Sequence, residues 1–315
     1  MKYIKTFRKI RKEDVFVAGG KGASLGEMVN AGILVPNGFV ITSQAFEFFL
    51  KENDLIQEIE SILKKVRHKE MESIERASEQ IKEHILNAKI PPQLLKDIKQ
   101  SFSRLKSKFV AVRSSATLED GKDHAWAGQL DSFLNANSKN LEENIKKCFA
   151  SLFTPRAIFY RFEKGLSKSY VSVAVVVQKM VQSEKSGVAF SVHPVTENYN
   201  QMIIEASWGL GEAIVSGEIT PDSYVVDKIS GAVLDMNISE KTKGLYKSAK
   251  GSNEWKKLPL KKVNTRCLTD KELIKLGVIV KKIEKHYNFP CDIEWASKES
   301  KFYILQSRPI TTLRK

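Results

Sequence analysis

The segment from residue 43 to about 106 alternates apolar and charged residues with a helical period. Its clearest stripe recurs at i, i+4, i+7, i+8 and i+11 and consists of Leu55, Ile59, Ile62, Leu63 and Val66. Residues at these spacings share one face of a helix, so the segment predicts helices that bury one side. The same period predicts helices at 141–153 and 270–287.

Short apolar runs bounded by turn residues predict strands elsewhere in the chain. These runs lie at 109–113, 171–180, 187–192, 201–207 and 223–227. Two further runs within 291–309 flank the polar turn "SKESK" and predict a hairpin. Helices and strands are mixed along the chain, which favours an α+β fold.

The hairpin at 291–309 concentrates polar residues on one side. Because side chains alternate across a strand, Asp292 and Glu294 are expected on the face opposite Ile293 and Trp295. The same face of the return strand is expected to hold Ile304, Gln306 and Arg308. Carboxylate and amide oxygens are ligands that Mg²⁺ accepts, with phosphate oxygens completing its shell. The alternative is a hairpin whose polar face only meets solvent.

The stretch "VAGGKGASLGEMVNAG", residues 17–32, has the composition of a phosphate-binding loop. Glycines at 19, 20 and 22 free the backbone to approach a ligand, Lys21 supplies a positive charge, and Ser24 can cap a helix that begins there. The spacing excludes a Walker loop and the dinucleotide pattern G-x-G-x-x-G. A glycine turn that opens a helix, with its lysine in solvent, is the alternative.

The stretch "FVAVRSSATLEDGKDHAWAGQLDSFLN", residues 109–135, leads a short apolar strand into Arg113. A guanidinium group matches two phosphate oxygens at once. The hydroxyl residues that follow, expected to be further donors, are Ser114, Ser115 and Thr117. Beyond them, a loop with Gly128 and Trp126 can fold over a ligand and exclude water. A β-turn with a salt-bridged arginine is the alternative.

A single polar residue, Gln178, closes the apolar run of 175–181. An amide in this position can meet the edge of a nucleotide base. It can equally mark the end of a strand without any ligand.

Length and charge limit the classes of protein that remain. With 315 residues the chain is longer than a typical single domain of ~100–200 residues. The net charge of +14 invites a nucleic-acid interpretation, but the lysines share helix faces with glutamates and no recognition motif is present. No apolar run approaches the ~20 residues that cross a bilayer. A cytoplasmic enzyme or binding protein is therefore predicted, with neither nucleic acid nor membrane as partner.

The three cysteines do not suggest a disulfide or a zinc site. Cys148, Cys267 and Cys291 are widely spaced and form no C-x-x-C motif. Their odd number also argues against a set of paired disulfides.

Seven motifs in order resemble one known family. They are "GGKGASLGEM", "VPNGFVIT", "VAVRSSATLED", "AGQLDSFLN", "SGVAFSVHPVT", "EASWGLGEAIVSGEITPDSYVVD" and "LQSRPIT". The sequence resembles the N-terminal ATP-binding module of the phosphoenolpyruvate synthase, pyruvate phosphate dikinase and rifampicin phosphotransferase family. The resemblance implies an ATP-grasp fold, one module over 1–315 with lobes of about 1–180 and 181–315 and the nucleotide between them.

The resemblance also implies roles for individual residues. It implies that three residues contact the phosphates and act in catalysis: Lys21, Arg113 and Arg308. A lid loop over the phosphates includes Gly128 and Ser132. Gln178 lies by the adenine, while Mg²⁺ is held by Glu294 and Gln306 with Asp292 nearby. Two positions depart from the family pattern: Ser132 stands where relatives often carry Thr, and His193 where Asp or Asn is common.

A further departure concerns the phosphate acceptor. In this family ATP phosphorylates a histidine in a Gly-rich Ser-His segment of a separate swivelling domain. None of the five histidines here, His68, His84, His124, His193 and His286, lies in such a segment. The chain is therefore expected to supply the ATP half of a split system similar to phenylphosphate synthase, or to be a truncated family member.

The predicted function is that of a Mg·ATP-dependent phosphotransferase component. It cleaves ATP at the β-phosphate to leave AMP, as the resemblance implies, and passes a phosphoryl group to a histidine on a separate protein or domain. The final small-molecule acceptor, whether pyruvate, a phenol or an antibiotic, binds elsewhere. Two alternatives stay open: a kinase that phosphorylates a small molecule directly, and an ATP-binding regulatory module without turnover.

Overall fold

The computed structural model of the chain describes all but a few short segments. The described residues are 2–117, 120–121, 124–125, 130–165, 171–249 and 251–313, with the backbone alone at 120–121 and 124–125. The chain forms two compact units. Unit 1 comprises Met1–Glu27 and Asn37–Met180, and unit 2 comprises Met28–Pro36 and Val181–Lys315. Residues 28–36 thus belong to unit 2, which a linear division of the chain does not anticipate.

Unit 1 is built on an antiparallel five-stranded sheet. Its strands, in spatial order, are β1 (Ile4–Thr6), β2 (Gly38–Ile41), β7 (Val173–Lys179), β3 (Val110–Ala116) and β6 (Ser132–Ala136). The predicted strands at 109–113 and 171–180 are confirmed as β3 and β7. The sequence interpretation missed the three others, which are short or carry mixed polarity.

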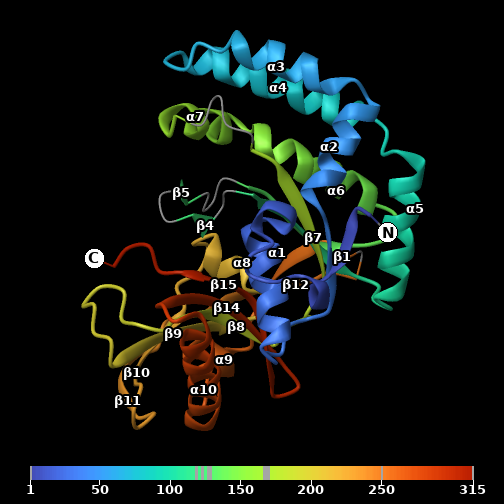
Figure 1. Cartoon of the computed structure of the whole chain (residues 1–315). Helices are drawn as coiled ribbons and strands as arrows, with labels where there is room; N and C mark the ends of the chain where they lie inside the picture. Colours follow the sequence, from blue (N-terminus) through green and yellow to red (C-terminus); the bar gives the residue numbers. More distant parts are fainter. Residues whose placement is uncertain are drawn as a thin grey trace. The chain divides into compact units, whose positions relative to one another are not determined.

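Helices cover one face of this sheet and form the main core of unit 1. They are α2 (Ser43–Glu52), α3 (Leu55–Lys64), α4 (Met71–Asn87), α5 (Pro92–Arg104), α6 (Leu141–Ala150) and α7 (Pro155–Glu163). Val112 of β3 and Val175 of β7 belong to the buried cluster under them. The helical prediction for 43–106 is confirmed as four helices, of which α3 and α4 lie side by side (Figure 1). The predicted helix 141–153 is α6 followed by the 3-10 turn η2 (Ser151–Phe153).

Helix α1 (Val15–Asn30) packs near the other face of the unit 1 sheet through its glycines. A side chain at Gly22 would come within 3.2 Å of Val40 and 3.7 Å of Val176. The helix is kinked at Gly19, whose φ of 68° is the left-handed conformation that glycine tolerates. Ser24 lies inside this helix, so the expectation that it caps a helix start is wrong.

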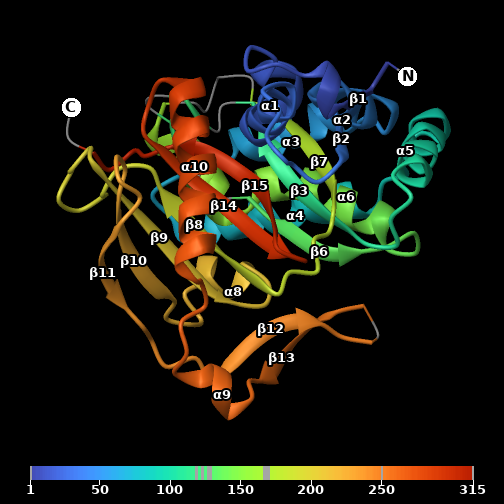
Figure 2. The same cartoon turned by 90° about the horizontal axis from the view of Figure 1, so that it is seen from below.

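Unit 2 is built on an antiparallel six-stranded sheet. In spatial order its strands are β11 (Val233–Asn237), β10 (Asp222–Asp227), β9 (Gln201–Trp208), β8 (Lys185–Phe190), β14 (Cys291–Lys298) and β15 (Lys301–Pro309). Helix α10 (Asp270–Tyr287) lies across one face (Figure 2). Its Gly277 approaches Met202 of β9, and its Leu276 and Val280 are buried.

The remaining elements are short. They are η1 (Phe7–Lys9), β4 (Asp120–Gly121), β5 (His124–Ala125), α8 (Glu212–Val215), β12 (Lys243–Lys247), β13 (Asn253–Lys257) and α9 (Leu260–Val263). Strands β12 and β13 form a separate two-stranded ribbon (Figure 2). Among the described residues, none of the helices combines the length and the apolar character that a membrane crossing requires.

Candidate functional site

The face of the unit 1 sheet opposite its helical core gathers three of the predicted site residues. Arg113 pairs directly with Ser132 of β6 on one side and with Val176 of β7 on the other. Gln178 pairs with Ala111, two residues before Arg113. Because cross-strand partners and every second residue share a face, Arg113, Ser132 and Gln178 lie on the same side. Arg113 and Gln178 are buried, and Ser132 is exposed.

The glycine loop reaches the same side of the sheet through Ser115. The Ser115 hydroxyl donates to the carbonyl of Ala18 at 2.9 Å and accepts from the amide of Gly22 at 3.1 Å, so it bridges the kink at Gly19. A Cβ at Gly19 would stand 2.2 Å from the Ser115 carbonyl oxygen, which excludes any larger residue. Lys21 lies between the two bridged residues and is thereby held near Arg113's strand.

The three hydroxyl groups after Arg113 are occupied inside unit 1. Ser114 contacts the carbonyl oxygens of Asp131 and Cys148 and the hydroxyl of Ser151, and Thr117 donates to the carbonyl of Ser172. With Ser115 they are almost fully buried. Their expected role as donors to phosphate is therefore corrected: a buried hydroxyl is stabilised by an internal partner, and these three fasten β3 to its neighbours.

In unit 2 the predicted hairpin forms with the expected turn. Strands β14 and β15 join through Glu299 and Ser300, which both have positive φ, as a two-residue turn of type I′ requires. In the ladder Asp292 stands opposite Arg308 and Glu294 opposite Gln306. The four predicted side chains thus share one face as directly opposed pairs.

Ile304 departs from the predicted face. The register shifts after Glu294, so that Trp295 pairs with Ile304 and Leu305 is the extra residue. A bulge resets the alternation of the strand that carries it. Ile304 is therefore fully buried with Trp295, and not beside Gln306.

Asp292 and Arg308 form an ion pair across the hairpin. The Nε and Nη2 atoms of Arg308 lie 2.8 Å and 2.7 Å from Oδ2 of Asp292. Burial raises the pKa of the Asp292 carboxyl, and Glu294 raises it further, while Arg308 opposes the rise. In this structure Arg308 neutralises Asp292, and its 39% exposed side chain keeps part of the guanidinium accessible.

Glu205 of β9 lies in the same row of the sheet as the candidate metal ligands, and the sequence interpretation did not include it. It pairs with Val188 of β8, which pairs with Glu294, so these residues and Gln306 form one row across the sheet. Burial and the charge of Asp292 raise the pKa of Glu205. A signal was available, since Glu205 is the one charged residue within the apolar strand "MIIEASW".

Replacing Glu205 by glutamine is expected to raise the melting temperature of the metal-free chain at neutral pH. Its folded-state pKa is raised, so its stabilising contribution exists below its usual pKa of 4.5 and is lost as the pH rises through the folded value. Glu205→Gln should then melt a few degrees at most above the parent at pH 7, and the gap should narrow near pH 4.

The matched control is Glu299→Gln, because the Glu299 side chain is 75% exposed. Calorimetric scans of both variants with a chelator check the prediction. If Glu205→Gln melts below the parent at pH 7, the carboxylate is stabilising and the electrostatic interpretation of this row fails.

The hairpin face suits a hard divalent cation by its donor chemistry. It offers carboxylate oxygens from Glu294 and Asp292 and an amide oxygen from Gln306, which are oxygen ligands that such a cation accepts. Across the described ranges, His, Cys, Asp and Glu side chains form no group of three or more suited to hold a metal ion. Phosphate oxygens would have to complete the coordination.

The predicted lid falls largely outside the described residues. Gly128 and Trp126 belong to the undescribed segment 126–129. Ser132, at the start of β6, is the described member of this prediction.

His193 has a local structural role. Its Nδ1 accepts from the amides of Val195 and Thr196 at 3.3 and 3.2 Å, which is what an Asp or Asn side chain does at a turn. This accounts for a histidine at a position where an acidic or amide residue is common.

The cysteines do not provide a nucleophile. All three are free and buried. Burial raises the pKa of Cys148 and of Cys291 to about 12 and also raises that of Cys267. The thiolate is the reactive form, so covalent cysteine catalysis is not supported.

The comparison with protein families shows to which family the chain belongs. Residues 15–315 match the family described as "Pyruvate phosphate dikinase, AMP/ATP-binding domain". The chain belongs to this family. The matched region covers most of both units, including helix α1 with its glycines and the β14–β15 hairpin of unit 2.

Relatives of this domain are longer proteins. The chain is 44% identical to "Probable phosphoenolpyruvate synthase" of Methanocaldococcus jannaschii, over 100% of the chain and 27% of that protein. It is also 44% identical to a protein of the same description from Archaeoglobus fulgidus, over 97% of the chain and 41% of that protein. "Rifampicin phosphotransferase" of Bacillus cereus is 38% identical, over 99% and 36% respectively. The chain thus spans less than half the length of these relatives.

Proposed function

We propose that the chain binds Mg·ATP in an ATP-grasp arrangement and transfers a phosphoryl group to a histidine on a separate protein or domain. The observation that carries the proposal is the hairpin register, in which Glu294 stands opposite Gln306 and Asp292 opposite Arg308. Membership in an AMP/ATP-binding domain family supports ATP as the nucleotide.

Unit 1 would contribute the groups that bind and orient the nucleotide. Lys21 and Arg113 would contact phosphate oxygens, Arg113 with two donors in a fixed plane and Lys21 as a point charge. Gln178, on the same sheet face, would contact the adenine, and Ser132 with Gly128 would belong to the loop over the phosphates. The rigid sheet suits this role, because phosphoryl transfer depends mostly on positioning and electrostatics.

Unit 2 would contribute the metal ligands and a further cation. Glu294 and Gln306 would hold Mg²⁺, with Asp292 beside them, and the ion would neutralise charge on the phosphate oxygens. Arg308 would exchange part of its contact with Asp292 for a phosphate oxygen. Lys21, Arg113 and Arg308 would then stabilise the charge that shifts during transfer.

The acceptor would lie outside this chain. The relatives described as phosphoenolpyruvate synthase and rifampicin phosphotransferase are more than twice as long as the matched region, which leaves room for other domains. A phosphohistidine-bearing domain and a site for the final small-molecule acceptor are the partners we propose. ATP would give AMP, one phosphoryl group would pass to the histidine, and the remaining phosphate would leave as inorganic phosphate with water as its acceptor.

Variants of the metal ligands test this proposal. Glu294→Ala removes a charged ligand and is expected to weaken Mg·ATP binding at least about tenfold, or ~1.4 kcal/mol. Gln306→Ala removes a neutral ligand and should weaken it less. Isothermal titration calorimetry with ATP in excess Mg²⁺ measures both.

Glu299→Ala is the matched control for these variants. It removes a carboxylate from the turn of the same hairpin, and that side chain is 75% exposed. Its affinity for Mg·ATP should equal that of the parent. Parental affinity in Glu294→Ala, in a protein that melts normally, would remove Glu294 from the metal site.

A further inference from the structure

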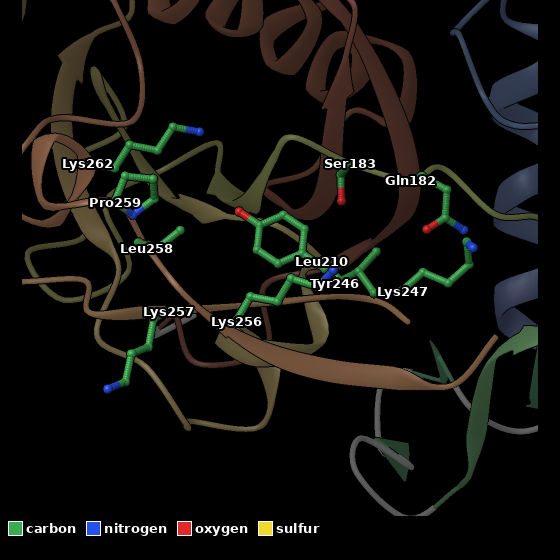
Figure 3. Close-up of a pocket in the computed structure, with 10 residues that line it drawn as sticks. All are labelled: Gln182, Ser183, Leu210, Tyr246, Lys247, Lys256, Lys257, Leu258, Pro259 and Lys262. Atoms are coloured by element: carbon green, nitrogen blue, oxygen red, sulfur yellow. The ribbon is translucent and has the colours of Figure 1, made fainter. Parts of the chain in front are cut away.

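Unit 2 contains a pocket that shares no lining residue with the hairpin face. Its volume is about 430 Å³, within the range of ~300–1,000 Å³ typical of small-molecule sites. The walls come from the segment after unit 1, the turn after β9, the β12–β13 ribbon, the residues before α9 and α9 itself (Figure 3). We refer to it as the lysine pocket.

The charge of the lysine pocket is strongly positive. Its lining residues include Lys247, Lys256, Lys257 and Lys262, and no acidic residue. Lys256 forms an ion pair with Glu254 at 2.8 Å, but both side chains are more than 40% exposed, and exposed pairs of this kind are weak. In Figure 3 Lys247 reaches toward Gln182 and Lys256 lies under Tyr246, whereas Lys257 points away. An anion would therefore meet Lys247 and Lys256.

The centre of the pocket is apolar and flat. The ring of Tyr246 stands at its middle (Figure 3), and Leu210 and Leu258 are buried beside it. Gln182 and Ser183 add polar groups at one side. This combination suits a ligand with a planar or apolar body and a charged end.

Hydrogen bonds tie the walls of the pocket to one another. The amide of Leu210 donates to the carbonyl of Leu245 at 2.8 Å, and the amide of Leu258 donates to the carbonyl of Thr242 at 2.9 Å. The Ser183 hydroxyl donates to the carbonyl of Gly209 at 2.8 Å. The pocket is thus formed before any ligand arrives, which lowers the entropic cost of binding.

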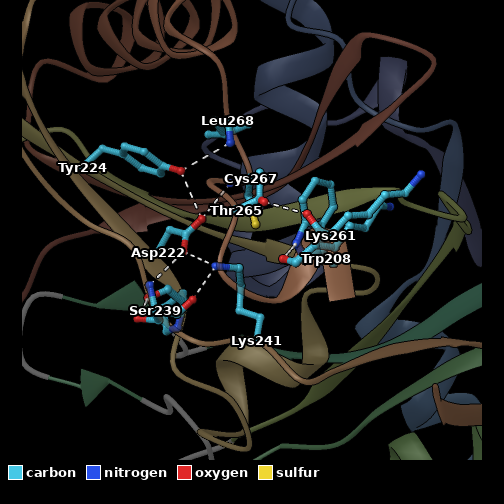
Figure 4. Close-up of polar contacts among 11 residues, drawn as sticks. Trp208, Asp222, Tyr224, Ser239, Lys241, Lys261, Thr265, Cys267 and Leu268 are labelled. Carbon is cyan, nitrogen blue, oxygen red and sulfur yellow. Dashed lines mark hydrogen bonds and ion pairs between the residues drawn. The ribbon is translucent and has the colours of Figure 1, made fainter. Parts of the chain in front are cut away.

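Lys262 is fixed at the rim by Trp208. Its ammonium group lies 4.3 Å from the centroid of the Trp208 ring, and the indole N–H donates to its carbonyl at 3.3 Å. The adjoining Val263 carbonyl accepts from the amide of Lys241, whose side chain is paired with Asp222 in the buried network of Figure 4. The segment that carries Lys262 is therefore held by the core of unit 2.

We propose that the lysine pocket binds a small organic anion with a phosphate or carboxylate group on a flat or apolar body. This site is additional to the proposed ATP function and does not depend on it. The lysines recognise the charge, and Tyr246 with the leucines recognises the body. Such a ligand would be a metabolite that the chain senses or carries.

Titration with 1-naphthyl phosphate tests the proposal, with binding followed by the fluorescence of the probe. The full chain is expected to bind it at least about tenfold more tightly than inorganic phosphate or 1-naphthol, because each of these offers only half of the recognised chemistry. Lys247→Ala/Lys256→Ala should weaken binding at least about tenfold, by loss of two charges. Lys257→Ala, the matched control, should change it less than about twofold.

Three results would overturn the proposal. The first is the absence of saturable binding, and the second is an equal loss in Lys257→Ala, which would mean a diffuse surface charge. The third is displacement of the probe by saturating Mg·ATP, which would assign the pocket to the nucleotide. Glu294→Ala should bind the probe like the parent, so failure of the ATP proposal and failure of this one are distinguishable.

Discussion

Arg113→Lys is expected to slow phosphoryl transfer about a hundredfold while the affinity for ATP stays within about threefold of the parent. Contacts that strengthen as charge shifts in the transition state lower the rate without a matching loss of binding, and one such contact contributes ~3 kcal/mol. Arg113 belongs to β3, which is hydrogen-bonded to β6 on one side and to β7 on the other. A lysine at this position cannot reproduce the planar, two-donor geometry of the guanidinium group.

The measurement is AMP formation in a single turnover of labelled ATP with a histidine-bearing acceptor domain. Arg76→Lys is the control, because Arg76 has a 60% exposed side chain and pairs with Glu72 on the surface. Transfer at the parental rate would contradict the role of Arg113. A large drop in melting temperature would mean that Arg113 holds its strand in place.

Lys241→Met is expected to lower the stability of unit 2 by ~3–5 kcal/mol, the cost of leaving one member of a buried ion pair alone. The side chains of Lys241 and Asp222 are both 0% exposed and in contact. Asp222 also accepts from the amides of Ser239 and Cys267 and from the hydroxyl of Tyr224 (Figure 4). Without the ammonium group its charge would stay buried with neutral donors only.

The melting temperature should fall by roughly 10 °C. Lys147→Met is the control, since Lys147 pairs with Glu143 on the surface and such pairs contribute ~0–1 kcal/mol. In the double variant Asp222→Asn/Lys241→Met the loss should be smaller than the sum of the two single losses. Equal melting of Lys241→Met and Lys147→Met would contradict the account of this network.

Local patterns predicted the elements with clear periodicity. Helix α10 has the predicted bounds because an amphipathic stripe follows a capping box in which Thr269 and Glu272 bond each other's backbone. The sequence also predicted the β14–β15 hairpin, but its turn register, continued without a shift, would place Leu305 and not Gln306 opposite Glu294. The bulge at Leu305 is therefore what brings Gln306 and Arg308 to the same face as Glu294 and Asp292.

Features that depend on distant partners could not be predicted in this way. The hydroxyl of Ser115 bonds to two residues of α1 that lie almost a hundred positions earlier in the chain. The sequence around Arg113 does not reveal these partners, so Ser115 was predicted to be a donor to phosphate. The bulge at Leu305 separates Ile304 from the face that holds Gln306 and Arg308, and no residue type in "FYILQS" marks it. The burial of Lys241 with Asp222 likewise arises only when β10 meets the segment before β12.

ATP binding through a bound metal is tested most directly by a calorimetric titration of the parent chain with ATP, with and without Mg²⁺. ATP is expected to bind at least about tenfold more tightly in Mg²⁺, since the negative phosphates would otherwise be repelled by the carboxylates of the hairpin face. ATP binding of equal strength in a chelator, or none in either condition, would contradict this expectation.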